Sequence, residues 1–280
     1  MTGFGTPLVT FAHLSDTHIR TAADPLVSGV ADSRALVERA VGVLTSWDAD
    51  CAAWLFSGDL ADEGDVEAYA WLRALVEPAA ASRGVEVIWA NGNHDDRAAF
   101  RAGLLGLPAT DEPYNAEREV GGVRFLLLDT NLPGRPEGRV APASLAWLAD
   151  RLGEASGPTV LVMHHTPLPP VQDAAALWPL TNPEEVAPLL AGSGVRLILG
   201  GHFHQPSMGT FAGVPVAEAT SLAYTQDLTE GRTLRGQDAA QGFSLVQIYP
   251  DAVQSTLVGL ERGRLVHNVI SPEDAARLRP

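Results

Sequence analysis

An apolar run passes directly into metal-binding side chains in Val9-Thr10-Phe11-Ala12-His13-Leu14-Ser15-Asp16-Thr17-His18. Four further segments repeat this arrangement, in which an apolar run predicts a β-strand and polar residues follow its end. They are residues 52–56 before Ser57-Gly58-Asp59, 85–89 before Asn91-Gly92-Asn93-His94-Asp95, 160–163 before His164-His165, and 195–199 before Gly200-Gly201-His202-Phe203-His204. Because ligands of an open α/β sheet bind at the carboxyl ends of its strands, the five segments predict one shared site.

The side chains in these segments are carboxylates, imidazoles and an amide. Zinc, manganese and iron(II) accept this set of ligands without a thiolate. Taken singly, each motif could be only a turn, and Gly201-His202-Phe203-His204 is the most specific of them. Two metals about 3.5–4 Å apart share a bridging carboxylate and a water, which they turn into a nucleophile. The joint pattern therefore favours a two-metal hydrolytic site.

Charge and composition exclude several classes of function. The net charge of −15 argues against binding polymeric nucleic acid through a basic surface, although bound metals could still attract a small anion. Cys51 is the only cysteine, so no intramolecular disulfide can form, and we expect a buried, inert thiol. No apolar run approaches the roughly 20 residues of a membrane span. The N-terminal residues do not fit a signal peptide, which predicts a cytoplasmic location.

The order of the predicted elements indicates a layered α/β protein. Apolar periodicity predicts helices over residues 32–47, 65–76, 142–152 and 182–192, with Asp65 as a cap and Pro78 ending or bending the second helix. After Gly213, residues 214–217, 243–249, 253–258 and 264–268 predict strands of a second sheet, with a turn at Pro250-Asp251. Residues 225–241 predict a long loop. No linker interrupts the chain, so we expect a single domain over residues 1–280.

These motifs resemble those of the calcineurin-like metallophosphoesterases. The pattern of that family is D-x-H, G-D, G-N-H-[DE], H and G-H-x-H, and every element stands in this chain. The surrounding residues are similar to bacterial, and especially actinobacterial, class III 3′,5′-cyclic nucleotide phosphodiesterases. That likeness is carried by Ser15-Asp16-Thr17-His18, Gly58-Asp59-Leu60-Ala61-Asp62, Gly92-Asn93-His94-Asp95-Asp96-Arg97 and Tyr224-Thr225-Gln226-Asp227-Leu228-Thr229.

The resemblance implies a four-layer α/β/β/α sandwich of the metallo-dependent phosphatase type and a particular set of ligands. One metal would be bound by Asp16, His18, Asp59 and His204, and the other by Asp59, Asn93, His164 and His202, with Asp59 bridging. The metals would be an iron and manganese or a zinc and manganese pair. His94 would be the catalytic residue, facing the phosphate together with Asn93 and protonating the leaving oxygen.

Four residues near the motifs remain open at this point. His165 could replace His164 as a ligand, although the family pattern favours the first histidine. His13 is expected to be structural. Asp95 could orient His94 or be a solvated loop carboxylate, and Arg20 could bind a phosphate or be solvated.

The resulting hypothesis is a dinuclear phosphodiesterase that hydrolyses cyclic AMP and other 3′,5′-cyclic nucleotides to nucleoside 5′-monophosphates through a metal-bridging hydroxide. The same core could instead act on 2′,3′-cyclic nucleotides, glycerophosphodiesters or phosphomonoesters, because surrounding loops set specificity. A non-catalytic scaffold is the remote alternative, since no ligand of the family pattern is missing. A homodimer is a further possibility that the sequence leaves open.

Overall fold

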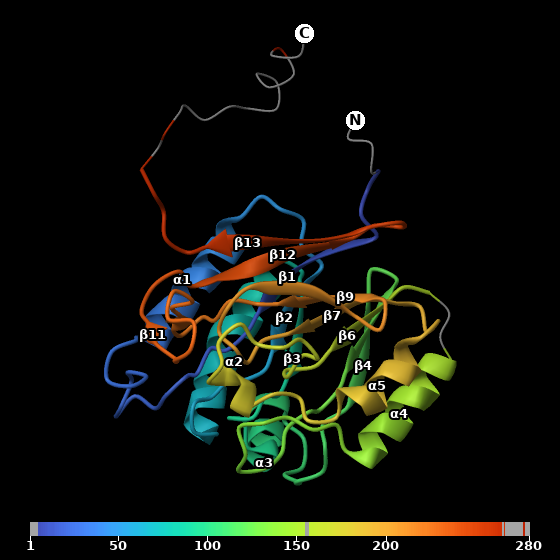
Figure 1. Cartoon of the computed structure of the whole chain (residues 1–280). Coiled ribbons are helices and arrows are strands. Elements are labelled where there is room, and N and C mark those ends of the chain that lie inside the picture. The colour runs from blue at the N-terminus through green and yellow to red at the C-terminus, as the bar shows by residue number, and fades with distance from the viewer. Residues whose placement is uncertain (1–4, 155–156, 265, 267–276, 278–280) are drawn as a thin grey trace.

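Two β-sheets pack face to face at the centre of the molecule (Figure 1). The computed structural model describes residues 5–154, 157–264, 266 and 277. The first sheet has the strand order β13-β12-β1-β2-β3. Its strands are β1 (Val9–Leu14), β2 (Ala53–Ser57), β3 (Glu86–Ala90), β12 (Gly242–Ile248) and β13 (Val253–Gly259). Strands β1, β2 and β3 are parallel, so their carboxyl ends meet at one edge.

The second sheet has the strand order β4-β5-β6-β7-β9-β8. Its strands are β4 (Ala116–Val120), β5 (Val123–Leu127), β6 (Thr159–Val162), β7 (Val195–Gly200), β8 (Ser207–Phe211) and β9 (Val214–Glu218). The four strands β5, β6, β7 and β9 are parallel, and β4 and β8 close the two edges as antiparallel partners.

Helices cover the outer faces of both sheets. Helices α1 (Ser33–Ser46) and α2 (Val66–Ser82) pack on the first sheet, and α4 (Pro142–Gly153) and α5 (Pro183–Leu190) pack on the second (Figure 1). Shorter turns of helix are α3 (Arg97–Ala99), the π-helix η1 (Phe100–Leu105) and the 3₁₀-helix η2 (Ala175–Leu177). The predicted α/β/β/α sandwich is confirmed.

Strand β5 shows why the central strands are continuous apolar runs. Phe125 faces the first sheet and meets Phe11 edge to face, with 5.0 Å between ring centroids. The next residue, Leu126, belongs to the cluster on the opposite face, which contains Leu148 of α4. Both faces of the strand are buried, so alternation with polar residues is lost.

The helix ends show ordinary capping chemistry, and two predictions for α2 differ from the structure. Asp32 caps α1 by accepting a hydrogen bond from the Ala35 backbone N–H at 3.0 Å, and Pro142 occupies the first turn of α4. Asp65 precedes α2 but makes no side-chain cap. Pro78 was predicted to end or bend α2, and the first of these alternatives is wrong because the helix continues to Ser82. Helix α2 packs Leu72, Val76 and Ala80 into the core on both sides of Pro78, and this burial outweighs the missing backbone bond.

The C-terminal strands do not form a sheet of their own, so that prediction was wrong. Strand β9 extends the second sheet beside β7, and the β12–β13 hairpin extends the first sheet beside β1. The edges of β1 and β7 carry backbone N–H and C=O groups that need partners, and pairing with β12 and β9 supplies them. The predicted turn at Pro250-Asp251 is confirmed, since Ile248 pairs with Val253. The strand predicted over 264–268 lies largely outside the described residues, and Arg264 and Val266 are not in a strand.

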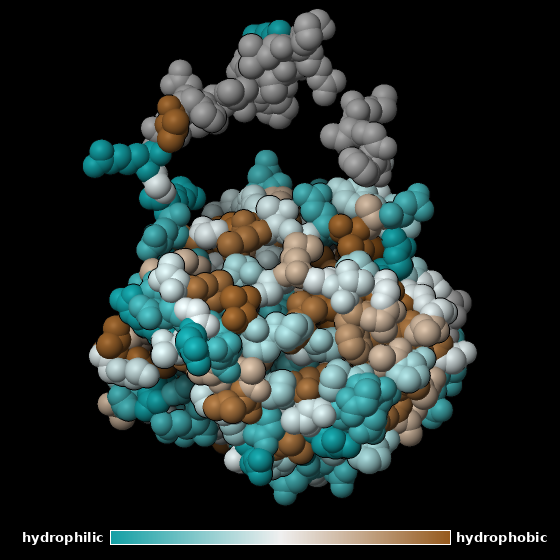
Figure 2. Space-filling view, viewed as in Figure 1, coloured by the Kyte–Doolittle hydropathy of each residue, from teal (hydrophilic) through white to brown (hydrophobic). Residues whose placement is uncertain are grey.

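Three other findings concern the surface and the loops. The predicted loop over residues 225–241 contains a short antiparallel ribbon of β10 (Thr225–Gln226) and β11 (Gly236–Gln237). Cys51 is half-buried rather than buried, and burial raises the pKa of its thiol. On the face in Figure 2, hydrophobic residues are scattered among hydrophilic ones. Within the described part of the chain, no helix is long and apolar enough to cross a membrane.

Candidate metal centre

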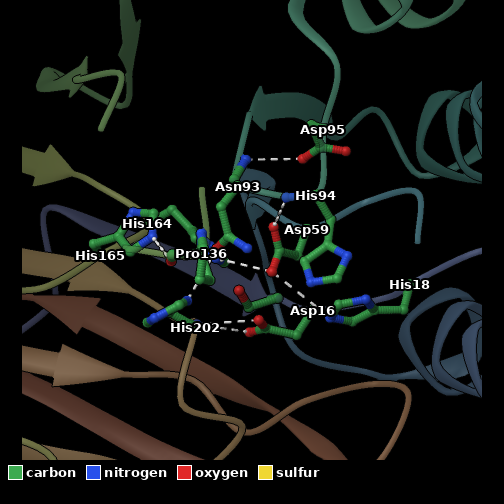
Figure 3. Close-up of polar contacts among 12 residues, drawn as sticks. Asp16, His18, Asp59, Asn93, His94, Asp95, Pro136, His164, His165 and His202 are labelled. Carbon is green, nitrogen blue, oxygen red and sulfur yellow. Dashed lines mark hydrogen bonds and ion pairs between the residues drawn. The ribbon is translucent and has the colours of Figure 1, made fainter. Parts of the chain in front are cut away.

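The predicted site residues from both sheets converge in one place. Asp16 and His18 follow β1, Asp59 follows β2, and Asn93 follows β3, while His164 follows β6 and His202 and His204 follow β7. Figure 3 shows Asp59 in the middle of this group, with side chains from both sheets directed toward it. The shared site predicted from strand ends is therefore present at the edge where the two sheets meet.

Two groups of possible ligands share a single carboxylate. In Asp16, His18, Asp59 and His204, one ligand atom per residue lies within 4.8 Å of every other, and the same holds for Asp59, His164 and His202. The Oδ2 atom of Asp59 is 3.1 Å from Nε2 of His164 and 3.7 Å from Nε2 of His18. Asp59 is thus placed between the two groups, where a bridging ligand would be.

The hydrogen bonds of the histidine rings show which ring nitrogens could bind a metal ion in the first ligand group. Nδ1 of His18 contacts Oδ1 of Asp62 at 2.9 Å, and Nδ1 of His204 contacts the Tyr224 carbonyl at 2.8 Å. Both partners can only accept, so each Nδ1 carries the proton and each Nε2 presents a lone pair. These two Nε2 atoms lie 3.0 Å apart. Two lone pairs at that distance repel unless a cation lies between them and the nearby carboxylates.

The second group repeats this arrangement. Nε2 of His202 donates to the Trp178 carbonyl at 2.7 Å, which leaves the lone pair of Nδ1 3.0 Å from Oδ1 of Asn93. Nδ1 of His164 donates to the Ser57 carbonyl at 3.0 Å, and its Nε2 faces Oδ2 of Asp59 at 3.1 Å. Metal-binding histidines commonly donate their other N–H in this way. The residues fit two metal ions.

The pKa values of the candidate ligands also favour binding of cations. Burial lowers the pKa of His202 to about 3 and of His204 to about 4, so both rings are neutral near pH 7. Burial opposes ionisation of Asp59, but the neighbouring His164 and other histidines hold the pKa of its carboxyl well below the ordinary value. Burial also opposes protonation of His164, yet Asp59 and Asp16 raise the pKa of His164 to about 9. The carboxylates of the centre therefore stabilise positive charge on the groups beside them.

Backbone strain is concentrated in the same residues. Asp16, His18, Asp59, His202 and His204 all have positive φ, between 41° and 75°. Only three other non-glycine residues of the described chain, Ser28, Ala212 and Ala240, share this feature. Such conformations cost about 1–3 kcal/mol each and accumulate at functional sites.

Two motif glycines allow the loops to approach one another. A Cβ atom on Gly92 would lie 2.2 Å from Oδ1 of Asp59, and one on Gly201 would lie 2.2 Å from Oδ2 of Asp16. Neither position has room for any side chain. The glycines of G-N-H-D and G-H-x-H are thus explained by close packing against the candidate ligands.

His94 lies beside the centre with an accessible side chain. Its backbone N–H donates to Oδ1 of Asp59 at 2.9 Å, and its Nδ1 donates to the Asp62 carbonyl at 2.7 Å. The side chain is 41% exposed. Burial lowers the pKa of His94, but the carboxylates of Asp59 and Asp62 outweigh this effect and raise it. Nε2 is left free to meet a substrate.

Asp95 has a different role from both that the sequence suggested. It is 1% exposed, so it is not a solvated carboxylate, and none of its hydrogen bonds goes to the His94 ring. It accepts backbone N–H groups from Gly92, Leu60 and Ala61, and the Tyr69 hydroxyl at 2.8 Å. Asp95 ties the loop after β2 to the loop after β3, which fixes Asp59 against Asn93.

The other open residues can also be placed. Nδ1 of His165 contacts Oγ1 of Thr130 at 2.8 Å and its Nε2 contacts the Pro136 carbonyl, so its ring is occupied and the geometry favours His164 as the ligand. His13 contacts Ser57 and belongs to neither ligand group, as expected for a structural residue. Arg20 is neither solvated nor free for a phosphate, because it pairs with Asp62, Asp24 and Glu63.

Sequence reasoning missed Asp62 and the carbonyl groups of Tyr224 and Trp178. Asp62 contacts the His18 ring directly, and its carbonyl holds His94. Asp62 stands three residues after Asp59, a spacing that could have suggested it. No sequence signal marks a backbone carbonyl as a partner of a distant histidine.

A cavity of about 270 Å³ opens onto the centre. Its lining combines candidate ligands with apolar and amide side chains from more distant segments: Asp59, Asn93, His94, His202, His204, Pro136, Gln172, Ala175, Trp178, Phe203, Gln205, Tyr224, Gln226 and Leu234. A concave site with convergent polar groups is typical of a small-molecule enzyme.

Comparisons with known proteins agree with the geometry. Residues 9–206 match the model of the calcineurin-like phosphoesterase family. A Rhodococcus erythropolis protein named "Probable cyclic nucleotide phosphodiesterase" is 42% identical over 95% of this chain and 88% of its own. A cAMP/cGMP dual specificity phosphodiesterase of Mycobacterium tuberculosis is 40% identical over 95% of this chain and 84% of its own.

The fold is also similar to that of a solved structure. A dimetal phosphatase from Danio rerio matches with a TM-score of 0.67 over 91% of this chain and 97% of its own, at 16% identity. With the family match over all five motifs and the two long alignments, the chain belongs to the calcineurin-like phosphoesterases.

Proposed function

We propose that this protein is a two-metal phosphodiesterase that hydrolyses 3′,5′-cyclic nucleotides, cyclic AMP among them, to nucleoside 5′-monophosphates. The observation that carries the proposal is the pair of ligand groups that share Asp59. Relatives that are 42% and 40% identical over nearly the whole chain are named as cyclic nucleotide phosphodiesterases, which supports the substrate class.

The proposed ligands are those implied by the family pattern. Asp16, His18, Asp59 and His204 hold one metal, and Asp59, Asn93, His164 and His202 hold the other. When bound, two divalent metals supply Lewis acidity, which lowers the pKa of a water and offsets the charge of the phosphate. Imidazole, carboxylate and amide ligands without thiolate suit an iron–manganese or zinc–manganese pair.

His94 is the proposed proton donor to the leaving sugar oxygen. Its Nδ1 is engaged with the Asp62 carbonyl, so Nε2 is the atom directed to substrate. As water adds to phosphorus and the bond from phosphorus to O3′ breaks, the proton on Nε2 moves to O3′. Asn93, next to His94, holds the phosphate on the same side of the cavity.

A substrate panel tests this proposal. Turnover is measured with cyclic AMP, cyclic GMP, 2′,3′-cyclic AMP, a glycerophosphodiester, an aryl phosphodiester and an aryl phosphomonoester, each with manganese, iron(II) or zinc. Cyclic AMP should have the highest kcat/KM. Higher kcat/KM for the glycerophosphodiester would favour that alternative, which a 31% identical relative named glycerophosphodiester phosphodiesterase also suggests. If the protein hydrolyses none of these esters, the non-catalytic scaffold would be the remaining alternative.

Further predictions concern the whole chain. We propose one domain over residues 1–280, because side chains from both sheets belong to a single core cluster. The homodimer and the cytoplasmic location stay predictions. Sedimentation of the purified protein measures its oligomeric state, and fractionation of cells measures its location.

A further inference from the structure

Three glutamines line the cavity beside the metal centre, and only one of them is committed to the protein. The side-chain N–H groups of Gln172 donate to the carbonyls of Asp227, Glu230 and Thr233, so it holds the loop together. Gln205 and Gln226 have buried amide oxygens without a hydrogen-bond partner among the described residues. Gln205 is only 3% exposed, so its amide is largely shielded from bulk solvent. Buried amide oxygens are normally satisfied, which points to a missing donor from a ligand.

The two unpartnered glutamines lie next to the candidate ligands. Gln205 follows His204 directly, and the Gln226 backbone N–H donates to the His204 carbonyl at 3.3 Å. Both side chains line the same cavity as Asp59 and His94. A ligand whose phosphate meets the metals would therefore extend toward these amides.

The walls of this part of the cavity suit a flat, apolar group. A second cavity of about 450 Å³ shares Trp178, Tyr224, Gln226 and Leu234 with the first. Val27 and Ala31 add further apolar surface there. Trp178 is 38% exposed although it is a large aromatic residue, so part of its indole is available for contact. Aromatic faces of this kind stack well on nucleobases.

From these observations we infer that Gln205 and Gln226, together with Trp178 and Leu234 of the same cavity, form a purine subsite that reads the edge of the base. A carboxamide can offer its oxygen to the amino group of adenine or, after rotation, its NH₂ group to the O6 atom of guanine. The subsite should therefore accept both purines. This inference rests on the proposed phosphodiesterase function and adds to it the residues that select the base.

The test uses the full-length holoenzyme and four variants, Gln205→Leu, Gln226→Leu, Gln226→Glu and the control Gln254→Leu. Gln254 is an exposed glutamine on β13, in the first sheet, and lines none of the cavities at the metal centre. Turnover is measured with cyclic AMP, cyclic GMP and a methyl aryl phosphodiester. Calorimetry measures binding of AMP, GMP and ribose 5-phosphate, of which only the last lacks a base.

Each leucine variant at the subsite should lose roughly tenfold in kcat/KM on both cyclic nucleotides. Gln226→Glu keeps an acceptor but loses the donor, so it should raise the preference for cyclic AMP over cyclic GMP by roughly tenfold. The aryl diester rate and ribose 5-phosphate binding should not change in any variant. Gln254→Leu should resemble the wild type throughout.

The outcomes separate the subsite from the proposed function. An equal loss on the aryl diester and the cyclic nucleotides would mean general damage to the site and would overturn the subsite. Unchanged cyclic AMP to cyclic GMP ratios and unchanged AMP binding in all three subsite variants would also overturn it. A wild type that turns over the aryl diester but neither cyclic nucleotide would instead reject the proposed substrate.

Discussion

At the scale of single residues, Asp59 is the position on which the centre depends. Its carboxylate is 2% exposed, belongs to both ligand groups, and also accepts the His94 backbone N–H. Terminal ligands such as His204 belong to only one group. Asp59 therefore joins the two groups of candidate ligands to His94, the proposed proton donor.

We expect Asp59→Ala to lose both metals and more activity than His204→Ala. The reason is that removing a shared ligand disturbs both positions, whereas His204→Ala leaves one group complete. Metal content per chain and turnover of an aryl phosphodiester measure the two variants side by side. Near-normal metal content and rate in Asp59→Ala would reject the bridging role.

For His94→Ala we expect normal metal content and a reduced rate that depends on the leaving group. General acid catalysis contributes ~10²–10⁴-fold, and little of it is needed when the leaving group is a stable phenolate. Rates with cyclic AMP and with an aryl phosphodiester are compared in wild type and variant. An equal fractional loss on both substrates would remove His94 from the acid role.

Much of the centre could be predicted from residues alone, because Asp-x-His and Gly-His-x-His stand directly after strong apolar runs. The choice between His164 and His165 could not, since both follow the same strand. It depends on Thr130 and Pro136, which occupy the His165 ring from a distant loop. Asp95 was misread for the same reason, because its partners Leu60 and Tyr69 come from other elements.

At the scale of elements, some strands could be predicted because their sequences are apolar runs, and others could not. Strands such as β2 and β7 are buried on both faces and read as apolar runs. Strands β4, β5 and β8 were not predicted, and the centre of β4 is Glu117-Arg118-Glu119, the polar composition of an edge strand. The pairing of β12 with β1 joins residues more than 200 positions apart, and no local pattern contains that information.

The segment from Tyr224 to Gln241 connects the elements to the site. The Tyr224 carbonyl holds the His204 ring, and Gln226 and Leu234 line the cavity. We expect replacement of residues 227–235 by a Gly/Ser linker to leave metal content unchanged. It should lower kcat/KM for cyclic AMP more than for a small aryl diester, because Leu234 and the loop wall are lost.

Two controls accompany the linker variant. Sedimentation shows whether the loop also supports subunit contact, and circular dichroism shows whether the fold persists. Loss of metal in a folded linker variant would mean that the loop supports the His204 position rather than substrate choice. If the ratio of kcat/KM for cyclic AMP to kcat/KM for the aryl diester is unchanged, the loop has no part in substrate selection.

At the scale of the whole molecule, metals should stabilise the fold as well as the reaction. The centre joins loops from both sheets and holds five strained non-glycine residues. Ligands that bind only the native state stabilise it by ~4 kcal/mol at ~1,000 times their Kd. For a chain of this size, removal of metal should therefore lower Tm by roughly 8–16 °C. Differential scanning calorimetry with and without chelator measures the shift, and an unchanged Tm would contradict the coupling.

In the proposed centre, one shared carboxylate, that of Asp59, organises two metal ions into a single hydrolytic site. The most direct measurement is to titrate metal-free protein with manganese while following bound metal per chain and turnover of cyclic AMP together. We expect full activity to require two bound ions per chain, with activity rising as the second ion binds. Full activity with one bound ion, or with none, would contradict it.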